Sequence, residues 1–317
     1  MKLIVQIPCL NEEKTLPITV SDIPRQVEGI DEVEILVIDD GSTDRTVEAA
    51  QEAGVDHIVR FPKRKGLAKA FMAGIDACLR LGADIIVNTD ADNQYEGSDI
   101  PKLIQPILEG KAEMVIGDRQ VDTISHFSPM KKRLQKIGSW VVRQVSHTQV
   151  SDTTSGFRAY SREAALNINV LSWFSYTLET IIQAGSKDIA IENVTVGVNE
   201  QLRESRLSSS TGAYLRGSIP TIVRIYTMYQ PLKVFFYIGA MMFFSGFFIG
   251  LRFLYFYFTA GGTGHIQSLI LSSMLLIVGF QIVMIGLVAD VISANRKLIE
   301  DVLLRAKKLE LFLRKKS

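Results

Sequence analysis

The chain has 317 residues, of which 22% are charged, and its formal net charge is +1. This length allows one large domain or two small ones, and the small net charge hides an uneven distribution of charge along the chain. The two cysteines, Cys9 and Cys78, exclude a disulfide framework and a cysteine-based metal site, and both lie in apolar surroundings typical of core thiols. The composition changes near residue 230, from that of a soluble α/β domain to that of a membrane protein.

The first 200 residues alternate short apolar runs with helical patterns. The predicted strands cover residues 2–8, 33–38, 57–61, 85–89, 114–117 and 189–198. The predicted helices cover residues 45–53, 67–81, 100–109 and 173–184, and another begins near Pro17. Residues 128–150 carry a basic helical pattern, and residues 151–160 are expected to form a polar loop. This alternation predicts βαβ units and a largely parallel sheet.

Polar motifs follow four of the predicted strands at the points where the strands end. They lie at residues 8–12, 39–44, 90–94 and 117–119. In parallel α/β sheets ligands bind outside the carboxyl ends of the strands. We therefore expect these four motifs to form one site.

The motif Asp90-x-Asp92 supplies the oxygen ligands that a hard divalent cation such as Mg²⁺ takes together with substrate phosphates. Taken alone it is also consistent with a surface turn. The loop at residues 39–44 opens a helix, so its carboxylates could cap that helix or bind a base or ribose. Lys65-Gly66 opens another helix, where backbone N–H groups and a cation suit a phosphate.

Two apolar runs without charge follow, at residues 234–251 and 266–289. Each is long enough to cross a hydrocarbon core of about 30 Å at about 1.5 Å per residue, and a buried hairpin of a soluble protein is the alternative. The connection at residues 259–265 has no Lys or Arg, whereas residues 295–317 have eight against three acids. The positive-inside rule therefore predicts that both termini are cytoplasmic.

These patterns predict four segments. They are a cytoplasmic catalytic domain (1–210), an interfacial amphipathic helix (211–231), two transmembrane helices within 232–290 (about 232–258 and 266–290), and a basic cytoplasmic helix (291–317). For the segment 211–231, a helix packed in the protein core is the alternative. The last helix could lie on anionic lipid or pair with another subunit, which leaves a homo-oligomer open. No nucleic-acid partner is expected, because the basic residues beyond the sheet cluster beside the membrane spans.

The motifs occur in the order found in one enzyme family. They are Pro8-x-x-Asn11-Glu12, Asp39-Asp40-Gly-Ser-Thr-Asp44, Gly66-x-x-x-Ala70, Asp90-Ala-Asp92-x-Gln94, Gly117-Asp-Arg119 and Thr154-Ser155-Gly156-Phe157-Arg158-Ala159-Tyr160. Over residues 1–210 the chain resembles the family-2 glycosyltransferases of the GT-A fold, which is α/β with a Rossmann-like, mostly parallel mixed sheet. Within that family it most resembles the membrane-anchored polyprenyl-phosphate sugar synthases, such as dolichol-phosphate mannose synthase.

The resemblance implies inverting, metal-dependent transfer of a sugar from a GDP- or UDP-sugar to a polyprenyl (dolichyl or undecaprenyl) phosphate. It places the nucleotide and the donor at Pro8, Asn11, Glu12, Asp39, Asp40, Lys65, Gly66, Asp90, Ala91, Asp92, Ser155, Arg158, Arg203 and Arg206. It places Mg²⁺ or Mn²⁺ at Asp90, Asp92 and Gln94, and the acceptor phosphate at Arg119, Arg133 and Ser139. The catalytic candidates are Asp92, Arg119 and Glu179.

One stretch departs from the family pattern. The family usually has Arg-x-x-Gly-Glu-Ser-Lys before the membrane segment, and here residues 200–206 read Glu-Gln-Leu-Arg-Glu-Ser-Arg. Arg206 can replace the lysine as a diphosphate ligand and adds bidentate geometry. Arg203 stands at the glycine position. Which of the two arginines contacts the diphosphate therefore stays open.

The acceptor determines whether the reaction needs a base. A phosphate monoester has a second pKa of about 6, so it is largely anionic at about pH 7 and attacks without a strong base. A hydroxyl acceptor would need one, and Asp152 and Glu179 are the candidates, although they also fit a loop acid and a helix-surface acid. The alternatives are thus a glycolipid or polysaccharide transferase and, from another class, an inactive membrane scaffold. The Gln-x-x-Arg-Trp motif of processive synthases is absent.

Overall fold

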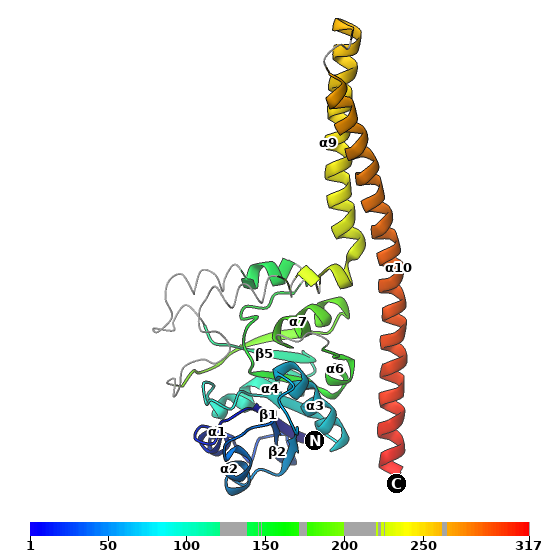
Figure 1. Ribbon diagram of the computed structural model, residues 1–317. Coiled ribbons are helices and arrows are strands. Elements are labelled where there is room, and N and C mark those ends of the chain that lie inside the picture. Colours follow the sequence, from blue (N-terminus) through cyan, green and yellow to red (C-terminus); the bar gives the residue numbers. More distant parts are fainter. Residues whose placement is uncertain are drawn as a thin grey trace. The chain divides into compact units, whose positions relative to one another are not determined.

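The computed structural model describes residues 1–120, 138–144, 146, 148–170, 176–199, 220, 223–224, 226–261 and 265–316. The chain divides into two compact units, residues 1–222 with 306–317, and residues 223–305. The first unit is built around a sheet with helices on both faces, and the second is a pair of long helices (Figure 1).

Seven strands form one mixed sheet in the order β3-β2-β1-β4-β6-β5-β7. They are β1 (Lys2–Cys9), β2 (Glu32–Asp39), β3 (His57–Arg60), β4 (Ile85–Asn88), β5 (Met114–Asp118), β6 (Arg158–Ser161) and β7 (Ile191–Thr195). Every neighbouring pair is parallel except the two pairs that β6 makes with β4 and β5. The carboxyl ends of the other six strands therefore lie at one edge. This confirms the predicted α/β fold with a mostly parallel mixed sheet.

The strand β6 was missed by the sequence analysis. It begins inside residues 151–160, which were expected to form a polar loop, so that prediction is wrong from Arg158 onward. The strand has four residues and lies between β4 and β5, where both faces of the sheet are covered, so it shows no alternation of polar and apolar side chains. The helix α6 (Arg162–Asn167) follows directly, and the Ser161 hydroxyl accepts the Ala164 N–H at 3.2 Å as its N-cap.

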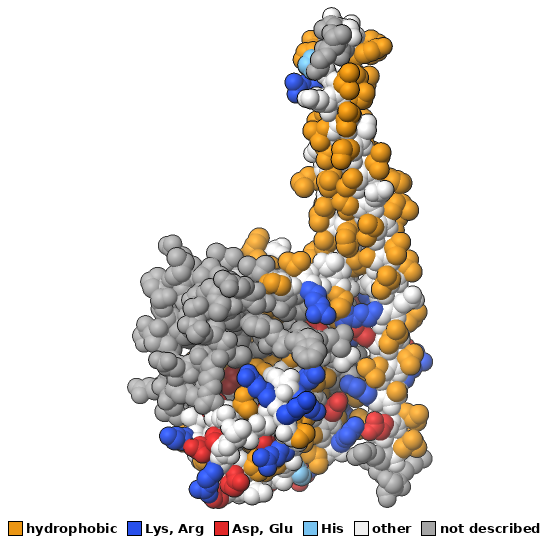
Figure 2. Space-filling model, viewed as in Figure 1, with side chains coloured by type: hydrophobic (Ala, Val, Ile, Leu, Met, Phe, Trp, Pro, Cys, Tyr) orange, Lys and Arg blue, Asp and Glu red, His pale blue; other side chains and the backbone are white. Residues whose placement is uncertain are grey.

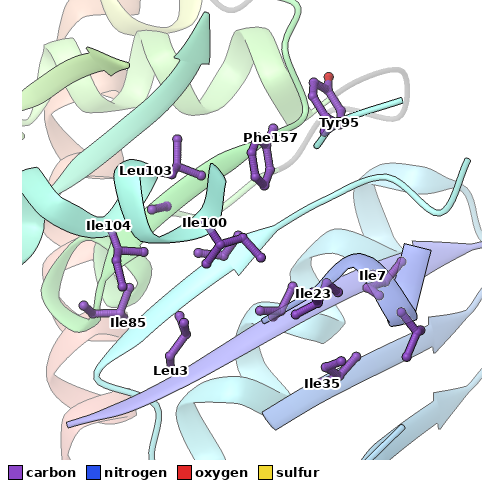
Figure 3. Close-up of a cluster of buried hydrophobic side chains, with 14 of the residues drawn as sticks. Leu3, Ile7, Ile23, Ile35, Ile85, Tyr95, Ile100, Leu103, Ile104 and Phe157 are labelled. Carbon is purple, nitrogen blue, oxygen red and sulfur yellow. The ribbon is translucent and has the colours of Figure 1, made fainter. Parts of the chain in front are cut away.

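Successive residues of the central strands face different helical layers. Leu3, Val5 and Ile7 of β1 belong to a core cluster with side chains of α1 (Leu16–Asp22) and α4 (Ile100–Leu108) (Figure 3). The side chain of Gln6 instead lies against Gly74 of α3 (Leu67–Arg80). This is the period of two that a strand imposes. Further helices of the unit include α2 (Thr46–Glu52), η1 (Gly97–Asp99) and α7 (Tyr176–Ser186).

The second unit is a hairpin of α9 (Pro231–Ala260) and α10 (Ile266–Lys316). Both helices are long and apolar enough to cross a membrane, judged by length and composition, and apolar side chains gather over them (Figure 2). The helix α10 continues without a break past residue 290, so the predicted second span and the predicted C-terminal helix form one helix.

The end of α10 belongs to the first unit and pairs with its surface. Lys307 Nζ lies 3.6 Å from Asp76 Oδ1 of α3, and Lys308 Nζ lies 2.7 Å from Glu163 Oε2 of α6. The sequence analysis left anionic lipid and another subunit open as partners of this basic segment. In this structure Lys307 and Lys308 contact the chain's own first unit, and both alternatives stay predictions. Exposed ion pairs of this kind contribute at most about 1 kcal/mol each.

Small residues at the hairpin interface let the two helix backbones approach closely. Ser272 and Gly279 of α10 are seven residues apart and lie against Gly246 and Gly239 of α9, which have the same spacing, and Gly286 lies against the side chain of Phe235. The Ser272 hydroxyl donates to the Gly246 carbonyl oxygen at 2.7 Å. Contacts between small residues are the usual means of helix association where the surroundings are as apolar as the side chains.

We expect Gly279→Leu to separate the hairpin. A Cβ at this position would lie 2.7 Å from the backbone nitrogen of Phe243, so even alanine would collide with backbone. Overpacking of this kind costs about 1–3 kcal/mol, and the midpoint of thermal unfolding in detergent should fall accordingly. Ser273→Leu, a change of similar size at an exposed neighbouring position, is the control. Equal midpoints for the two variants would contradict the predicted close contact.

Candidate active site

The loops that follow β1 and β2 are joined by hydrogen bonds between the two predicted motifs. The Asn11 N–H donates to Ser42 Oγ at 2.8 Å, and the Thr43 N–H donates to Asn11 Oδ1 at 2.8 Å. The Glu12 N–H donates to Thr46 Oγ1 at 2.8 Å. Asn11 has a φ of 56°, a left-handed conformation in which Asn is enriched. The two motifs therefore form one corner of the carboxyl edge.

Asp39, the last residue of β2, is completely buried in this corner. Its Oδ1 accepts the Ser42 N–H at 2.9 Å, but its Oδ2 has no hydrogen-bond partner among the described residues. Arg60 Nε lies 3.2 Å from Oδ2 without hydrogen-bond geometry, so it contributes charge only. A buried acceptor without a donor is costly. A ligand N–H or O–H at this position would remove that cost.

Asp40 forms a contact that differs from the expected one. Its Oδ1 accepts the Lys65 N–H at 2.6 Å, and its Oδ2 accepts the Gly66 N–H at 2.9 Å. In this structure the two N–H groups just before α3 are therefore bound by a carboxylate, and their expected contact with a phosphate stays a prediction. Gly41 has a φ of 79°, and a Cβ there would lie 2.7 Å from the Arg64 backbone nitrogen. The two loops thus pack backbone to backbone, which only glycine permits.

Asp90 and Asp92 follow β4 at the same edge. The Asp90 carboxylate lies against Gly156, because a Cβ there would be 2.7 Å from Oδ2 and 2.9 Å from Oδ1. Asp92 Oδ1 accepts the Gln94 N–H at 3.4 Å. Within the described part of the chain, no three His, Cys, Asp or Glu side chains form a ready-made metal cage. Two carboxylates and an amide fit Mg²⁺ or Mn²⁺, which take further ligands from phosphates and water.

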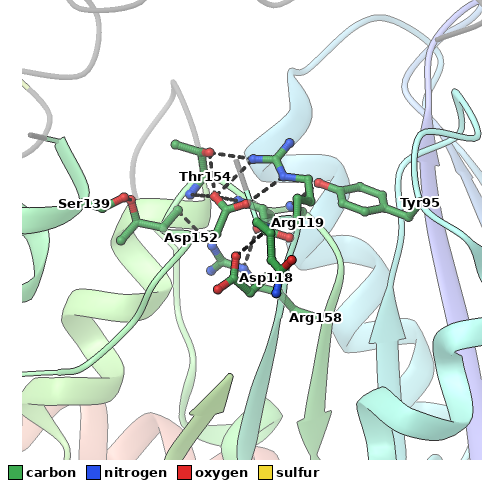
Figure 4. Close-up of polar contacts among 11 residues, drawn as sticks. Tyr95, Asp118, Arg119, Ser139, Asp152, Thr154 and Arg158 are labelled. Atoms are coloured by element: carbon green, nitrogen blue, oxygen red, sulfur yellow. Dashed lines mark hydrogen bonds and ion pairs between the residues drawn. The ribbon is translucent and has the colours of Figure 1, made fainter. Parts of the chain in front are cut away.

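Arg119 follows β5 and forms a bidentate pair with Asp152 (Figure 4). Nε lies 2.7 Å from Oδ2 and Nη2 lies 3.1 Å from Oδ1, and Nη2 also donates to Thr154 Oγ1 at 2.7 Å. Burial acts to raise the pKa of Asp152, but the charge and hydrogen bonds of Arg119, with those of Thr154, hold that pKa below its usual range. Ser139 Oγ lies 3.1 Å from Oγ1 of Thr153, which belongs to the same loop as Asp152 and Thr154.

Arg158 has a completely buried side chain beneath this loop. Nε donates to the Ser155 carbonyl oxygen at 2.8 Å, and Nη2 donates to that of Thr153 at 3.0 Å. Nη1 donates to the carbonyl oxygen of Thr177 at 2.8 Å and to Thr180 Oγ1 at 2.7 Å. The sequence analysis assigned Arg158 to donor binding. The structure places its guanidinium inside the protein, where it joins the loop to α7.

We expect Arg158→Met to lower the free energy of unfolding by roughly 3 kcal/mol or more. The change leaves three buried carbonyl groups without their donor, and each such group costs about 1–3 kcal/mol before relaxation. Urea denaturation of the purified protein would measure the loss. Arg162→Met is the matched control, because Arg162 Nη1 donates to the Ala83 carbonyl oxygen at a partly buried site. Similar losses for the two variants would contradict the supporting role.

The two carboxylates considered as bases are both buried. Glu179 of α7 is completely buried and accepts a hydrogen bond from Gln183 Nε2 at 3.2 Å, so its interpretation as a helix-surface acid is wrong. Asp152 is 3% exposed and engaged with Arg119, so it is not an ordinary loop acid. Both belong to the interior of the site.

Two residues beside Asp90 were not singled out from the sequence. Asn88 Nδ2 donates to the Gly156 carbonyl oxygen at 2.8 Å, and the Gly156 N–H donates to the Tyr95 hydroxyl at 2.8 Å. The available signal was an Asn inside an apolar strand, where Asn is depleted. Burial raises the pKa of Tyr95 to about 12, so its hydroxyl stays protonated.

Family models match both parts of the chain. The model described as glycosyl transferase family 2 matches residues 4–168, just over half of the chain, and the model described as GtrB C-terminal hairpin matches residues 230–294. The chain belongs to glycosyl transferase family 2. The predicted enzyme class, glycosyltransferase, is thereby confirmed, and the two long apolar helices coincide with the hairpin model.

Several relatives of this family 2 glycosyltransferase are named for polyprenyl phosphates. Polyprenol monophosphomannose synthase of Mycolicibacterium smegmatis is 28% identical over 67% of this chain and 82% of its own length. Undecaprenyl-phosphate mannosyltransferase of Micrococcus luteus is 26% identical over 71% of this chain and 93% of its own. Dolichol-phosphate mannosyltransferase of Pyrococcus furiosus is 31% identical over 67% of this chain and 60% of its own. The resemblance to polyprenyl-phosphate sugar synthases is confirmed.

Solved structures share the fold. Glucosyl-3-phosphoglycerate synthase of Mycobacterium tuberculosis, in complex with Mn²⁺, UDP-glucose and phosphoglyceric acid, matches with a TM-score of 0.58 at 25% identity over 71% of this chain and 79% of that chain. The same enzyme in complex with Mg²⁺ and UDP matches with a TM-score of 0.56 at 24% identity and the same coverage. The GT-A fold predicted for this glycosyltransferase is therefore confirmed, and its structural relatives bind Mn²⁺ or Mg²⁺.

Three predicted site residues of the glycosyltransferase, Arg133, Arg203 and Arg206, lie outside the described residues. The segment that leads toward the last two is described as far as Asn199. The Asn199 N–H donates to the Gln94 carbonyl oxygen at 3.0 Å, and Asn199 Nδ2 donates to the Tyr95 carbonyl oxygen at 3.2 Å. This segment therefore passes directly beside the Asp90–Gln94 motif.

Proposed function

We propose that this glycosyltransferase transfers a sugar, with inversion, from a GDP- or UDP-sugar to a polyprenyl phosphate, either dolichyl or undecaprenyl. The observation that carries the proposal is the state of the two candidate bases. Asp152 is bound through both oxygens by Arg119, and Glu179 is buried beside Gln183. A hydroxyl acceptor would need a base that can take its proton. A phosphate monoester is already largely anionic at about pH 7 and needs none.

The nucleoside of the donor is placed at the corner between β1 and β2. Asp39 Oδ2, the buried oxygen to which no described residue donates a hydrogen bond, would accept an N–H of the base or an O–H of the ribose. Pro8, Asn11 and Glu12 would line the same pocket. Asp40, Lys65 and Gly66 would form its wall, since Asp40 caps the helix that Lys65 and Gly66 open.

The diphosphate of the donor is placed at Asp90–Gln94. Asp90, Asp92 and Gln94 would hold Mg²⁺ or Mn²⁺, whose charge would stabilise the departing diphosphate. Ala91, small and buried, lies between the two carboxylates in the chain. The completely buried Ser155 hydroxyl has no hydrogen-bond partner in the part of the chain that the structure describes, and we assign it to a hydroxyl of the donor sugar.

The acceptor phosphate is placed at Arg119, Ser139 and Arg133. Arg119 contacts described residues through Nε and Nη2, and we assign Nη1 to the phosphate. The enzyme would then act by aligning the phosphate with the anomeric carbon, while Arg203 or Arg206 and Lys65 help to neutralise the leaving group. Because Arg158 and Glu179 are completely buried, we assign both to the support of the site.

The two long apolar helices are proposed to anchor the enzyme with the catalytic unit and both termini on the cytoplasmic side. Support comes from the charge distribution, because the connection between the helices has no Lys or Arg whereas residues 295–317 are rich in both. The acceptor would then reach the site from the bilayer to which the enzyme is anchored. A homo-oligomer remains a prediction.

Membranes that contain the full chain provide the test. They would be incubated with radiolabelled GDP-mannose, UDP-glucose and UDP-N-acetylglucosamine, each with a short polyprenyl phosphate. We expect one of the donors to yield a labelled polyprenyl-phosphate sugar of inverted anomeric configuration, and EDTA to abolish the product. Transfer to diacylglycerol or to a saccharide, but not to polyprenyl phosphate, would overturn the acceptor assignment. No metal-dependent turnover of any donor would favour the inactive scaffold.

A further inference from the structure

Buried side chains from three segments form hydrogen bonds with both peptide groups of Gly156. Its N–H donates to the Tyr95 hydroxyl at 2.8 Å. Its carbonyl oxygen accepts from Asn88 Nδ2 at 2.8 Å and from the Tyr176 hydroxyl at 3.4 Å. All three side chains are at most 3% exposed. The position of this glycine is therefore set by the protein interior and not by solvent.

Gly156 in turn forms the surface against which the Asp90 carboxylate packs, here called its seat. Both carboxylate oxygens lie within 3 Å of the place where a Cβ of residue 156 would be. The carboxylate consequently rests on the bare Cα of the glycine, and any shift of the glycine moves the surface on which it rests. Asn88 precedes Asp90 by two residues, and its side chain also donates to the Gly156 carbonyl oxygen. The Asn88 side chain therefore acts both at the end of the strand that leads to Asp90 and on the seat of the Asp90 carboxylate.

Asn88 is held in one orientation by its own partners. Its Nδ2 also donates to the Tyr176 hydroxyl at 2.8 Å, and its Oδ1 accepts from Gln6 Nε2 at 2.9 Å across the β1–β4 pairing. The Asn88 and Gln6 side chains are completely buried, and Gln6 Oε1 has no hydrogen-bond partner within the described ranges of the chain. An amide pair in a sheet interior costs desolvation that aliphatic side chains would avoid. Its use here is to fix the Gly156 carbonyl group.

We propose that Asn88 is a positioning residue for the divalent cation. The chain of hydrogen bonds from Gln6 through Asn88 to Gly156 holds the Asp90 carboxylate where it meets the ion. This inference rests on the proposed function, which assigns Asp90 to the metal. Residues behind metal ligands change metal affinity by about 10–100-fold when they are replaced.

The test measures Mn²⁺ binding directly, by the electron paramagnetic resonance signal of unbound Mn²⁺, in the full-length protein with UDP or GDP present. For Asn88→Ala we expect the Kd for Mn²⁺ to rise about 10–100-fold, with a matching rise in the Mn²⁺ concentration for half-maximal transfer and recovery of kcat at saturating Mn²⁺. Gly156→Ala should weaken binding at least as much, because its methyl group occupies the seat. Gly138→Ala is the control, since a Cβ there would have no atom of the described residues within 4 Å.

Tyr176→Phe keeps the test decisive if Asn88→Ala fails to fold. It removes one hydroxyl that contacts both Asn88 and Gly156 and leaves no cavity, and a several-fold rise in the Kd for Mn²⁺ is expected. Wild-type Mn²⁺ affinity in folded Asn88→Ala, Gly156→Ala or Tyr176→Phe would overturn the inference. So would wild-type affinity in Asp90→Ala. If the variants lose Mn²⁺ affinity but no polyprenyl-linked product forms, the inference stands and only the proposed acceptor fails.

Discussion

Replacement of Asp92 by alanine is expected to reduce sugar transfer by about 10³-fold or more. The carboxylate is placed against the metal ion and the departing diphosphate, where stabilisation of developing charge is worth several kcal/mol, and about 4 kcal/mol corresponds to this loss of rate. Asp92 is only partly buried at the carboxyl edge, so its truncation leaves no large cavity. The thermal midpoint should therefore stay close to that of the wild type.

The measurement is initial transfer from the donor that supports turnover, at saturating Mg²⁺ or Mn²⁺. Asp76→Ala is a suitable control, because Asp76 is a half-exposed carboxylate on α3 that takes no part in the proposed site. A rate within about tenfold of the wild type for Asp92→Ala would remove Asp92 from the catalytic assignment. Loss of transfer accompanied by a lower thermal midpoint would count as unfolding and would call for Asp92→Asn instead.

Replacement of Asp152 by alanine is expected to destabilise the catalytic unit by about 3–5 kcal/mol, because it leaves the buried Arg119 guanidinium without its counter-charge. The same change releases the arginine that is assigned to the acceptor phosphate, so transfer should fall as well. Urea denaturation measures the first effect. A loss of transfer without a loss of stability would contradict the structural role of the pair.

The pair also predicts a dependence of stability on pH. The pKa of Asp152 is lower in the folded protein than its ordinary value, because Arg119 and Thr154 outweigh burial. Its contribution is therefore fully present above the unfolded pKa of about 4 and is lost as the pH falls through the folded pKa. In Asp152→Asn the fall in unfolding free energy between about pH 5 and pH 2.5 should be shallower than in the wild type. Asp118→Asn, a change at a partly buried carboxylate that accepts the Gln120 N–H, is the control. Parallel curves would contradict the ion pair.

The positions of most strands along the chain could be predicted from the sequence, because the signal for a strand is local. The apolar runs that became β1, β2 and β4 are short, bounded by polar residues and buried on both faces, as strands of a parallel sheet must be. Their polar ends predicted the site because parallel strands deliver their carboxyl ends to one edge. The strand β6 was not predicted, because its neighbours in the sheet, β4 and β5, are far from it in sequence.

The partners of the site's charged side chains were not predictable in the same way. Arg119 and Asp152 are 33 residues apart, and Asp40 binds the N–H of Gly66, 26 residues later, just before α3 begins. Arg158 belongs to a motif associated with donor binding, yet its donors are directed at backbone carbonyl groups beneath the loop. Each contact depends on which loops come together when the sheet assembles. The periodicity of the local sequence carries no information about contacts between distant segments.

By itself, then, the sequence determined the fold class, the edge at which the motifs gather, the enzyme class and the apolar hairpin, because residue type and spacing along the chain carry that information. Only the tertiary structure decided that Asp40 is a cap, that Arg158 and Glu179 are interior, and that Asp152 is held by Arg119. It also decided that Gly156 supports Asp90. These are properties of burial and hydrogen bonding between distant segments, and they arise only when those segments are packed together.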